Sequence, residues 1–268
     1  MPLLYVYCDG PKGEEQRAGV ESVRALVRGV DWCETRVVER ATNLGLGRSI
    51  LAGVTEVFGR HEALIVFEDD ILCVPGTYAW MCSALEAYRD DPRVMSVTGW
   101  THPRVCPRDA GDRPYFDGRA ECWSWGTWSR VWPAMVDDAR TLLRRCQDRG
   151  ISPTRYGHDL PEMARDELRR NLWAVRLAYR HLVDGGLCVR PPWSAVEHIG
   201  FDPQATNSQF ATEWMNPPLR RAPPIPERWP EPVENPECAP LWSRAYPSPA
   251  RRRWRHFVSR VMRRLRGA

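Results

Sequence analysis

Five apolar residues in a row, 63–67, run directly into three consecutive acids, Glu68, Asp69 and Asp70. A short unbroken apolar run of this kind is typical of a strand that is covered on both faces of a sheet. Up to about residue 100, such runs alternate with amphipathic helical spacing: the runs lie at 3–7, 36–39 and 94–98, and the helical stretches at 20–30, 50–58 and 78–88. This alternation predicts an α/β fold built on a parallel sheet.

The remainder of the chain has a different texture. Glycine, proline and aromatic residues dominate from 100 to 132, and helical spacing returns at 134–146 and 161–182. Residues 217–249 are rich in proline, which predicts an extended strap or linker. We therefore expect a domain over 1–216, the strap or linker over 217–249, and a basic amphipathic helix over 250–268.

Composition sets the class of protein. The chain has 268 residues, of which 43% are hydrophobic, enough for a sizeable core. It contains no run near the roughly 20 apolar residues that cross a bilayer. Its nine cysteines are scattered without the spacing of a zinc site, which fits a reducing compartment. These features predict a cytoplasmic protein.

The three acids carry the strongest chemical signal. In an open parallel sheet, ligands bind beyond the carboxyl ends of the strands. Three neighbouring carboxylates repel one another unless a cation neutralises them, and Mg²⁺ or Mn²⁺ shared with substrate phosphates is the common solution. The alternative is that these acids cap the next helix or face solvent.

Six short motifs occur in an order that resembles a known family. They lie at residues 4–11, 39–46, 65–70, 122–128, 173–176 and 197–202. Together they resemble bacterial family-2-type sugar transferases with a GT-A fold, which are similar to the N-acetylglucosaminyltransferase I family. The resemblance covers roughly residues 3–207.

The resemblance implies a metal-dependent glycosyltransferase. The expected reaction moves a sugar from a nucleotide-diphosphate donor, a UDP-sugar, to a hydroxyl of a glycan or small molecule with inversion. The cofactor would be Mn²⁺ or Mg²⁺, with Asp70 as metal ligand and His198 as a second candidate ligand, although a lone histidine is also an ordinary structural residue. Asp69 and Glu68 would hold the ribose and the sugar or its waters.

Further roles follow from the same resemblance. Asp9 would bind the nucleotide base, and Arg40, Asn43 and Arg48 would line the nucleotide pocket. For the two arginines, a solvated charge at a helix end remains an alternative. Trp123 and Trp125 would stack on the acceptor sugar, with core packing as the alternative.

The general base is not evident. In an inverting reaction a carboxylate takes the proton of the acceptor hydroxyl. The position where related families often carry this aspartate is Asn171, and an amide is not a useful proton acceptor. The remaining candidates are Asp159, Asp166 and Glu167, of which Asp159 is favoured because it lies in a predicted loop.

One further feature qualifies the expected function. The family has a strand before the one that resembles residues 3–7, so we expect a GT-A sheet that lacks its first strand. A non-catalytic or truncated relative that binds nucleotide is therefore an alternative, and a nucleotidyltransferase is a more distant one.

The C-terminal segment has a charge pattern of its own. Residues 251–268 contain eight arginines and no acids. A helix with this pattern predicts peripheral binding to an anionic membrane. Docking of its apolar stripe on the protein's own core is an alternative, and nucleic acid is not an expected partner.

Overall fold

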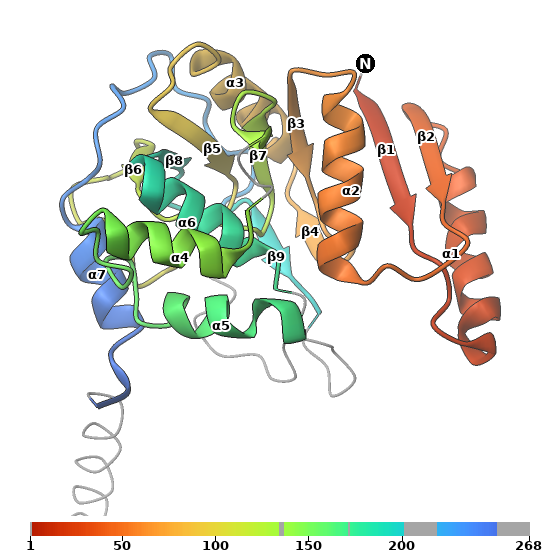
Figure 1. The fold of residues 1–268 in the computed structure, drawn as a ribbon. Coiled ribbons are helices and arrows are strands. Elements are labelled where there is room, and N and C mark those ends of the chain that lie inside the picture. The colour runs from red at the N-terminus through yellow and green to blue at the C-terminus, as the bar shows by residue number, and fades with distance from the viewer. Residues whose placement is uncertain (1, 134–136, 171, 201–218, 251–268) are drawn as a thin grey trace, which may run out of the picture. The chain divides into compact units, whose positions relative to one another are not determined.

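The computed structural model describes residues 2–133, 137–170, 172–200 and 219–250 (Figure 1). The chain divides into two compact units: unit 1 contains Met1–Glu62 and Asp166–Trp173, and unit 2 contains Ala63–Arg165 and Ala174–Ala268. Helices and strands are mixed along the chain, so the predicted α/β class is confirmed.

Unit 1 is built on two parallel strands. Strand β1 (Leu3–Cys8) pairs with β2 (Glu34–Glu39) from Leu3 opposite Glu34 to Cys8 opposite Glu39. A 3₁₀ turn, η1 (Glu14–Gln16), and helix α1 (Arg17–Arg28) connect them, and α2 (Leu46–Phe58) follows β2. Helix α2 packs closely on β1, because a Cβ at Gly53 would lie 3.2 Å from the Tyr7 ring.

Unit 2 contains a five-stranded sheet in the order β3-β7-β5-β8-β6. Its strands are β3 (Ala63–Val66), β5 (Val94–Thr98), β6 (Tyr115–Asp117), β7 (Trp125–Trp128) and β8 (Leu187–Arg190). Only β5 and β8 are parallel neighbours, and the other three pairings are antiparallel. The prediction of a parallel sheet is therefore wrong for this unit. The sheet is mixed because β7 inserts between β3 and β5, in the opposite direction to both.

A smaller ladder extends from the end of β3. Strand β4 (Ile71–Cys73) pairs antiparallel with β9 (Val196–His198), and Ile71 lies opposite His198. Backbone hydrogen bonds continue this ladder at both ends: Ile199 N donates to Asp70 O (2.8 Å), and Val74 N donates to Ala195 O (2.9 Å). The segment that follows the three acids is thereby fixed to a segment more than 100 residues later.

Helices cover both faces of the unit 2 sheet. Val97 of β5 belongs to a core cluster with α3 (Thr77–Ala87), whereas the Ser96 hydroxyl lies 2.8 Å from Nε2 of His181 on α6 (Ala174–Asp184). Successive side chains of a strand point to opposite faces, so α3 and α6 lie on opposite sides. A second core cluster joins α6 to three further helices: α4 (Ala139–Asp148), α5 (Leu160–Arg170) and α7 (Cys238–Ala245).

Two predicted elements differ from the structure. The helix predicted over 161–182 is two helices, α5 and α6, with a break before Ala174. Helix α4 begins later than predicted, because Asp138 caps its first turn by accepting a hydrogen bond from Thr141 N (2.8 Å). A side-chain oxygen in this position satisfies a backbone N–H that has no partner within the helix.

The proline-rich segment packs on unit 2. The Trp229 ring contacts Trp80 and Tyr88, with ring centroids 5.4 and 5.7 Å apart, and Trp242 of α7 is 1% exposed. The hydroxyl of Tyr88 also donates to Pro230 O (2.7 Å). The basic helix expected at 250–268 lies, apart from its first residue, outside the described residues. Among the residues that are described, no helix is both long and apolar enough to cross a bilayer.

Candidate functional site

Four strand ends meet at one edge of the unit 2 sheet. Trp125, the first residue of β7, pairs with Val66 at the end of β3 and with Thr98 at the end of β5. Strand β8 runs parallel to β5, so its last residue, Arg190, lies at the same edge. The acids 68–70 follow β3 after one residue, Phe67, and therefore extend from this edge, where ligands commonly bind in α/β sheets.

Asp70 and His198 lie side by side at this edge. The β4–β9 ladder brings them together, and Asp70 Oδ2 lies 3.1 Å from Nε2 of His198. His198 is 7% exposed. Two ligands that bind one octahedral Mg²⁺-sized ion at adjacent positions, each about 2.1 Å away, are about 3 Å apart. The observed spacing thus suits a direct hydrogen bond and also suits a shared cation.

The two oxygens of the Asp70 carboxylate have different surroundings. Its Oδ1 is buried, with no hydrogen-bond partner among the described residues. Gly200 lies against its other oxygen, because a Cβ at Gly200 would come within 2.2 Å of Asp70 Oδ2. A buried carboxylate oxygen without a donor is costly unless a cation, water or ligand satisfies it.

The histidine has a defined tautomer in this arrangement. Gly200 N donates to His198 Nδ1 (3.3 Å), so Nδ1 accepts and Nε2 carries the proton that points to Asp70. A metal at Nε2 needs this proton to move, with Nδ1 becoming the protonated nitrogen. In that state Nδ1 would no longer accept the hydrogen bond from Gly200 N.

The two tryptophans predicted to bind an acceptor lie in different surroundings. Trp123 is half-buried, and its ring centroid is 4.5 Å from that of His198. Trp125 is 0% exposed and stacks on Trp132, so the prediction that it contacts an acceptor is wrong. Trp125 packs in the core because it is the first residue of β7, which lies between β3 and β5 in the sheet. Of the two neighbouring acids, Glu68 is half-buried and Asp69 is exposed.

A buried network of charges lies next to Trp123 along the chain. Arg190 is 1% exposed, and its Nε lies 3.0 Å from Asp117 Oδ2. Arg119 binds Asp159 with both terminal nitrogens, at 3.1 and 2.8 Å. Trp242 Nε1 donates to Asp117 Oδ2 (2.7 Å), and its ring lies 4.3 Å from the Arg119 guanidinium carbon. Two guanidinium groups and two aspartates thus balance in charge.

A fifth ionisable group, Glu121, joins this network. Its Oε1 lies 3.5 Å from Arg190 Nη2, and its side chain is 13% exposed. Burial raises the pKa of Glu121 above its ordinary value, although the guanidinium groups of Arg190 and Arg119 oppose the shift. Burial also raises the pKa of the Cys122 thiol, and the charges of Glu68 and Glu121 add to that shift. Cys122 is therefore within electrostatic range of both glutamates.

The predicted general-base candidates are engaged elsewhere. Both oxygens of Asp159 are held by Arg119, and Asp166 pairs with Arg169 at 2.9 Å. Glu167 is 3% exposed. Asn171 lies outside the described residues. The two carboxylates that pair with Arg190 were missed in the sequence, because nothing in the spacing of Asp117 or Glu121 marks them as its neighbours.

The predicted nucleotide-binding residues belong to unit 1, where they join two loops. Asp9 follows β1, and its carboxylate accepts hydrogen bonds from Leu44 N (3.0 and 2.9 Å) and Gly45 N (2.9 Å). The Asn43 amide donates to Gly10 O (2.9 Å). Asp9 and Asn43 thus fix the loop after β2 to the end of β1, which is a structural role visible within the unit.

The two arginines of this region are held by the same part of unit 1. Arg40 donates to the Ser49 hydroxyl (2.9 Å) and lies 5.3 Å from the Tyr7 ring centroid. Arg48 is exposed, and its Nε donates to Leu44 O (3.0 Å). Binding of a nucleotide by these residues stays a prediction.

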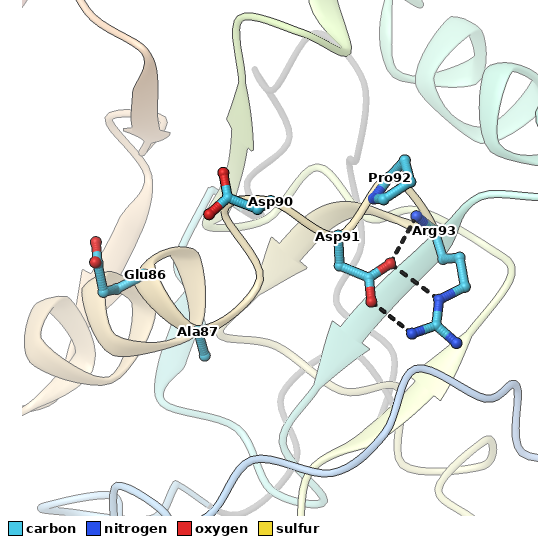
Figure 2. A pocket seen from close by; sticks show the side chains of 6 residues that line it. All are labelled: Glu86, Ala87, Asp90, Asp91, Pro92 and Arg93. Carbon is cyan, nitrogen blue, oxygen red and sulfur yellow. Dashed lines mark hydrogen bonds and ion pairs between the residues drawn. The ribbon is translucent and has the colours of Figure 1, made fainter.

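Figure 2 shows an open hollow at the other end of the unit 2 sheet. It is lined by Glu86, Ala87, Asp90, Asp91, Pro92 and Arg93. Asp91 is held by Arg93, whose Nη2 lies 2.6 Å from Asp91 Oδ2. These residues precede β5, so they lie at the amino edge of the sheet and are not part of the candidate site.

The described residues contain no group of three or more histidine, cysteine, aspartate or glutamate side chains able to hold a metal. Protein ligands are thus limited there to Asp70 and His198, and a bound cation would need substrate oxygens or water to complete its shell. Comparison with known proteins finds no family model that matches this chain and no curated protein that matches it.

Proposed function

We propose that the protein is a metal-dependent glycosyltransferase with a GT-A fold, which transfers a sugar from a UDP-sugar donor to a hydroxyl acceptor. The observation that carries this proposal is the pair formed by Asp70 and His198, whose donor atoms are 3.1 Å apart at the edge where four strand ends meet. The unpartnered Asp70 Oδ1 and the missing side chain at Gly200 support it.

The residues fit a Mn²⁺ or Mg²⁺ ion that is shared with a diphosphate. Asp70 supplies a carboxylate oxygen and His198 an imidazole nitrogen, both of which are common ligands of such metals. When bound, the ion would act as a Lewis acid that stabilises the negative charge of the departing diphosphate. The six ordered sequence motifs point to the same chemistry.

The chain's own residues would orient the reactants. Asp70 and His198 fix the position of the diphosphate at the carboxyl edge of the sheet, and the half-buried Trp123 ring beside His198 offers a flat apolar face to a sugar. Asp69 is exposed at the same turn and is free to accept hydrogen bonds from sugar hydroxyls.

Calorimetric titration of UDP in the presence of Mn²⁺ tests this proposal. We expect Asp70→Asn to weaken binding at least about 100-fold, because the neutral amide replaces the proposed metal ligand. Asp90→Asn is the matched control, since Asp90 lies in the hollow at the opposite edge and the variant is expected to bind like the wild type. Equal binding by wild type and Asp70→Asn would contradict the proposal.

A second measurement separates binding from turnover. Release of UDP from UDP-sugars in the presence of Mn²⁺ reports cleavage of the bond between sugar and diphosphate, with water as acceptor. If the wild type binds UDP but releases none from any donor or acceptor mixture, the non-catalytic alternative is favoured.

A further inference from the structure

The proposed transfer needs a proton acceptor, and the carboxylates suggested by sequence are poorly placed for this task. Asp159 is bound through both oxygens to Arg119, and Asp166 is bound to Arg169. Asp70 is adjacent to His198 and belongs to the proposed metal pair. A base for the acceptor hydroxyl must be a separate group that lies beside the same edge.

The segment that leads into β7 carries such a group. Its course is fixed at the edge of the sheet: Thr98 donates to Trp123 O (3.2 Å), and Gly99 N donates to Ser124 O (3.1 Å). Trp123 contacts His198, and Cys122 lies within electrostatic range of Glu68. Glu121 immediately precedes Cys122, and its carboxylate is paired with Arg190 rather than with Asp70 or His198.

We propose that Glu121 is the general base of the transfer reaction; this inference rests on the function proposed above. Its carboxylate takes the proton of the acceptor hydroxyl. The electron pair of that O–H bond forms the new bond from oxygen to the anomeric carbon. The bond between this carbon and the diphosphate oxygen breaks, and its electron pair leaves with the diphosphate.

The surroundings of Glu121 suit both of its charge states. Arg190 faces it at 3.5 Å, Arg119 adds a second positive charge, and Asp117 and Asp159 are the negative groups that face it. The two arginines and the two aspartates balance one another, so a protonated Glu121 leaves the network neutral. The ionised form is favoured by the arginines and disfavoured by burial.

The direction of the pKa shift suits a base. Burial shifts the pKa of Glu121 upward from its ordinary value, towards neutral pH. A base whose pKa lies closer to the working pH has a stronger tendency to take the proton while remaining largely ionised. The Glu121 side chain keeps a partial exposure of 13%.

The test compares the pH dependence of UDP release from UDP-glucose, UDP-galactose and UDP-N-acetylglucosamine with Mn²⁺, with water as acceptor. For the wild type, we expect kcat to fall with decreasing pH as Glu121 becomes protonated. Glu121→Gln keeps the size and polarity of the side chain next to Arg190. We expect its kcat to be lower by about 100-fold or more, with KM for the donor unchanged and without the acidic limb of the profile.

Two further variants separate catalysis from folding. Glu121→Asp retains a carboxylate, so it should recover part of kcat together with the acidic limb, shifted along the pH axis. Glu86→Gln changes a glutamate in the hollow at the opposite edge and should leave the profile unchanged. Calorimetry with UDP and Mn²⁺ should show that Glu121→Gln binds like the wild type.

The outcomes distinguish this inference from the function on which it rests. If the wild type releases UDP and Glu121→Gln retains kcat within about threefold, with the same acidic limb, the inference is overturned and the proposed function stands. If the wild type neither binds UDP with Mn²⁺ nor releases UDP, both fail. If it binds UDP but does not release UDP from any donor, there is no transfer reaction and the role of Glu121 as base is overturned.

Discussion

Gly200 matters for the Asp70 pair because it lacks a side chain. A Cβ at this position would come within 2.2 Å of Asp70 Oδ2, a distance at which the carboxylate must move. We predict that Gly200→Ala weakens binding of UDP with Mn²⁺ by about tenfold or more, since ligands must be held within about half an ångström of their working positions. Calorimetry measures this effect.

A control for this substitution lies in α1. A Cβ at Gly19 would meet nothing within 4 Å, so Gly19→Ala should leave binding unchanged and stabilise the helix by about 0.5–1 kcal/mol. If Gly200→Ala binds UDP with wild-type affinity, the position of Asp70 Oδ2 does not depend on the lack of a Cβ at residue 200.

The residues of the candidate site were predictable to different degrees. Asp70 could be found because it follows a buried apolar run, and His198 because its motif resembles a known family. Their close approach could not be found, since it depends on pairing of β4 with β9 across more than 100 residues. No local sequence pattern marks Glu121, because its neighbour Arg190 comes from β8, which is distant in the sequence.

Among the elements, α7 anchors the proline-rich segment to unit 2. Trp242 is 1% exposed, donates to Asp117 and lies over Arg119. We predict that Trp242→Ala lowers the free energy of unfolding by about 3–5 kcal/mol, through the cavity and the lost hydrogen bond. Urea denaturation measures this change.

Two further variants on α7 identify the cause of the stability loss in Trp242→Ala. Arg244→Ala alters an exposed residue of the same helix and should change stability by no more than about 0.5 kcal/mol. Trp242→Phe keeps an aromatic ring but lacks the indole N–H, so it should cost less than Trp242→Ala. A loss in Trp242→Ala as small as that in Arg244→Ala would mean that α7 does not support the core.

Some strands and helices could be predicted from the sequence and others could not, depending on their local sequence. Strands β1, β2, β3 and β5 lie close to their predicted positions, because each is a compact apolar or β-branched run. Strand β7 was missed since its sequence, Trp125–Trp128, has two small residues between two tryptophans and lies in a region rich in glycine and aromatic residues. Helix α7 contains a proline and follows a proline-rich stretch, so its local sequence disfavours a helix. Burial of Trp242 outweighs this low helix propensity.

For the whole molecule, two buried histidines predict a loss of stability in mild acid. Burial lowers the pKa of His181 to about 4 and that of His102 to about 3. Each is neutral in the folded protein at pH 5, whereas the unfolded chain takes up a proton below its ordinary pKa of about 6.5. Stability is therefore retained above pH 6.5 and lost as the pH falls towards 4, by about 2 kcal/mol for each histidine at pH 5.

Urea unfolding at pH 7 and pH 5 measures this loss. His181 Nδ1 and Nε2 lie 2.8 Å from Leu177 O and the Ser96 hydroxyl, contacts that a glutamine can partly replace. In His181→Gln, the difference in unfolding free energy between the two pH values should shrink by about 2 kcal/mol. The same difference in variant and wild type would mean that His181 does not take up a proton on unfolding.

The division into two units was not evident from the sequence, which predicts one domain over 1–216. The alternation of strands and helices runs without interruption from Leu3 to Thr98, and the boundary at Glu62 falls between a helix and a strand of that pattern. Hydrophobic periodicity reports which residues are buried, whereas the unit to which a strand belongs depends on its pairing partners.

Ser124 has a positive φ of 50°, between two tryptophans with different surroundings. In a regular strand, residues two apart share a face, and Trp123 would follow Trp125 into the core. The left-handed conformation at Ser124 interrupts that periodicity, so that one indole lies at the rim beside His198 and the other fills the interior. A substitution at position 123 therefore changes the surface beside His198, whereas a substitution at position 125 changes the packing of the core.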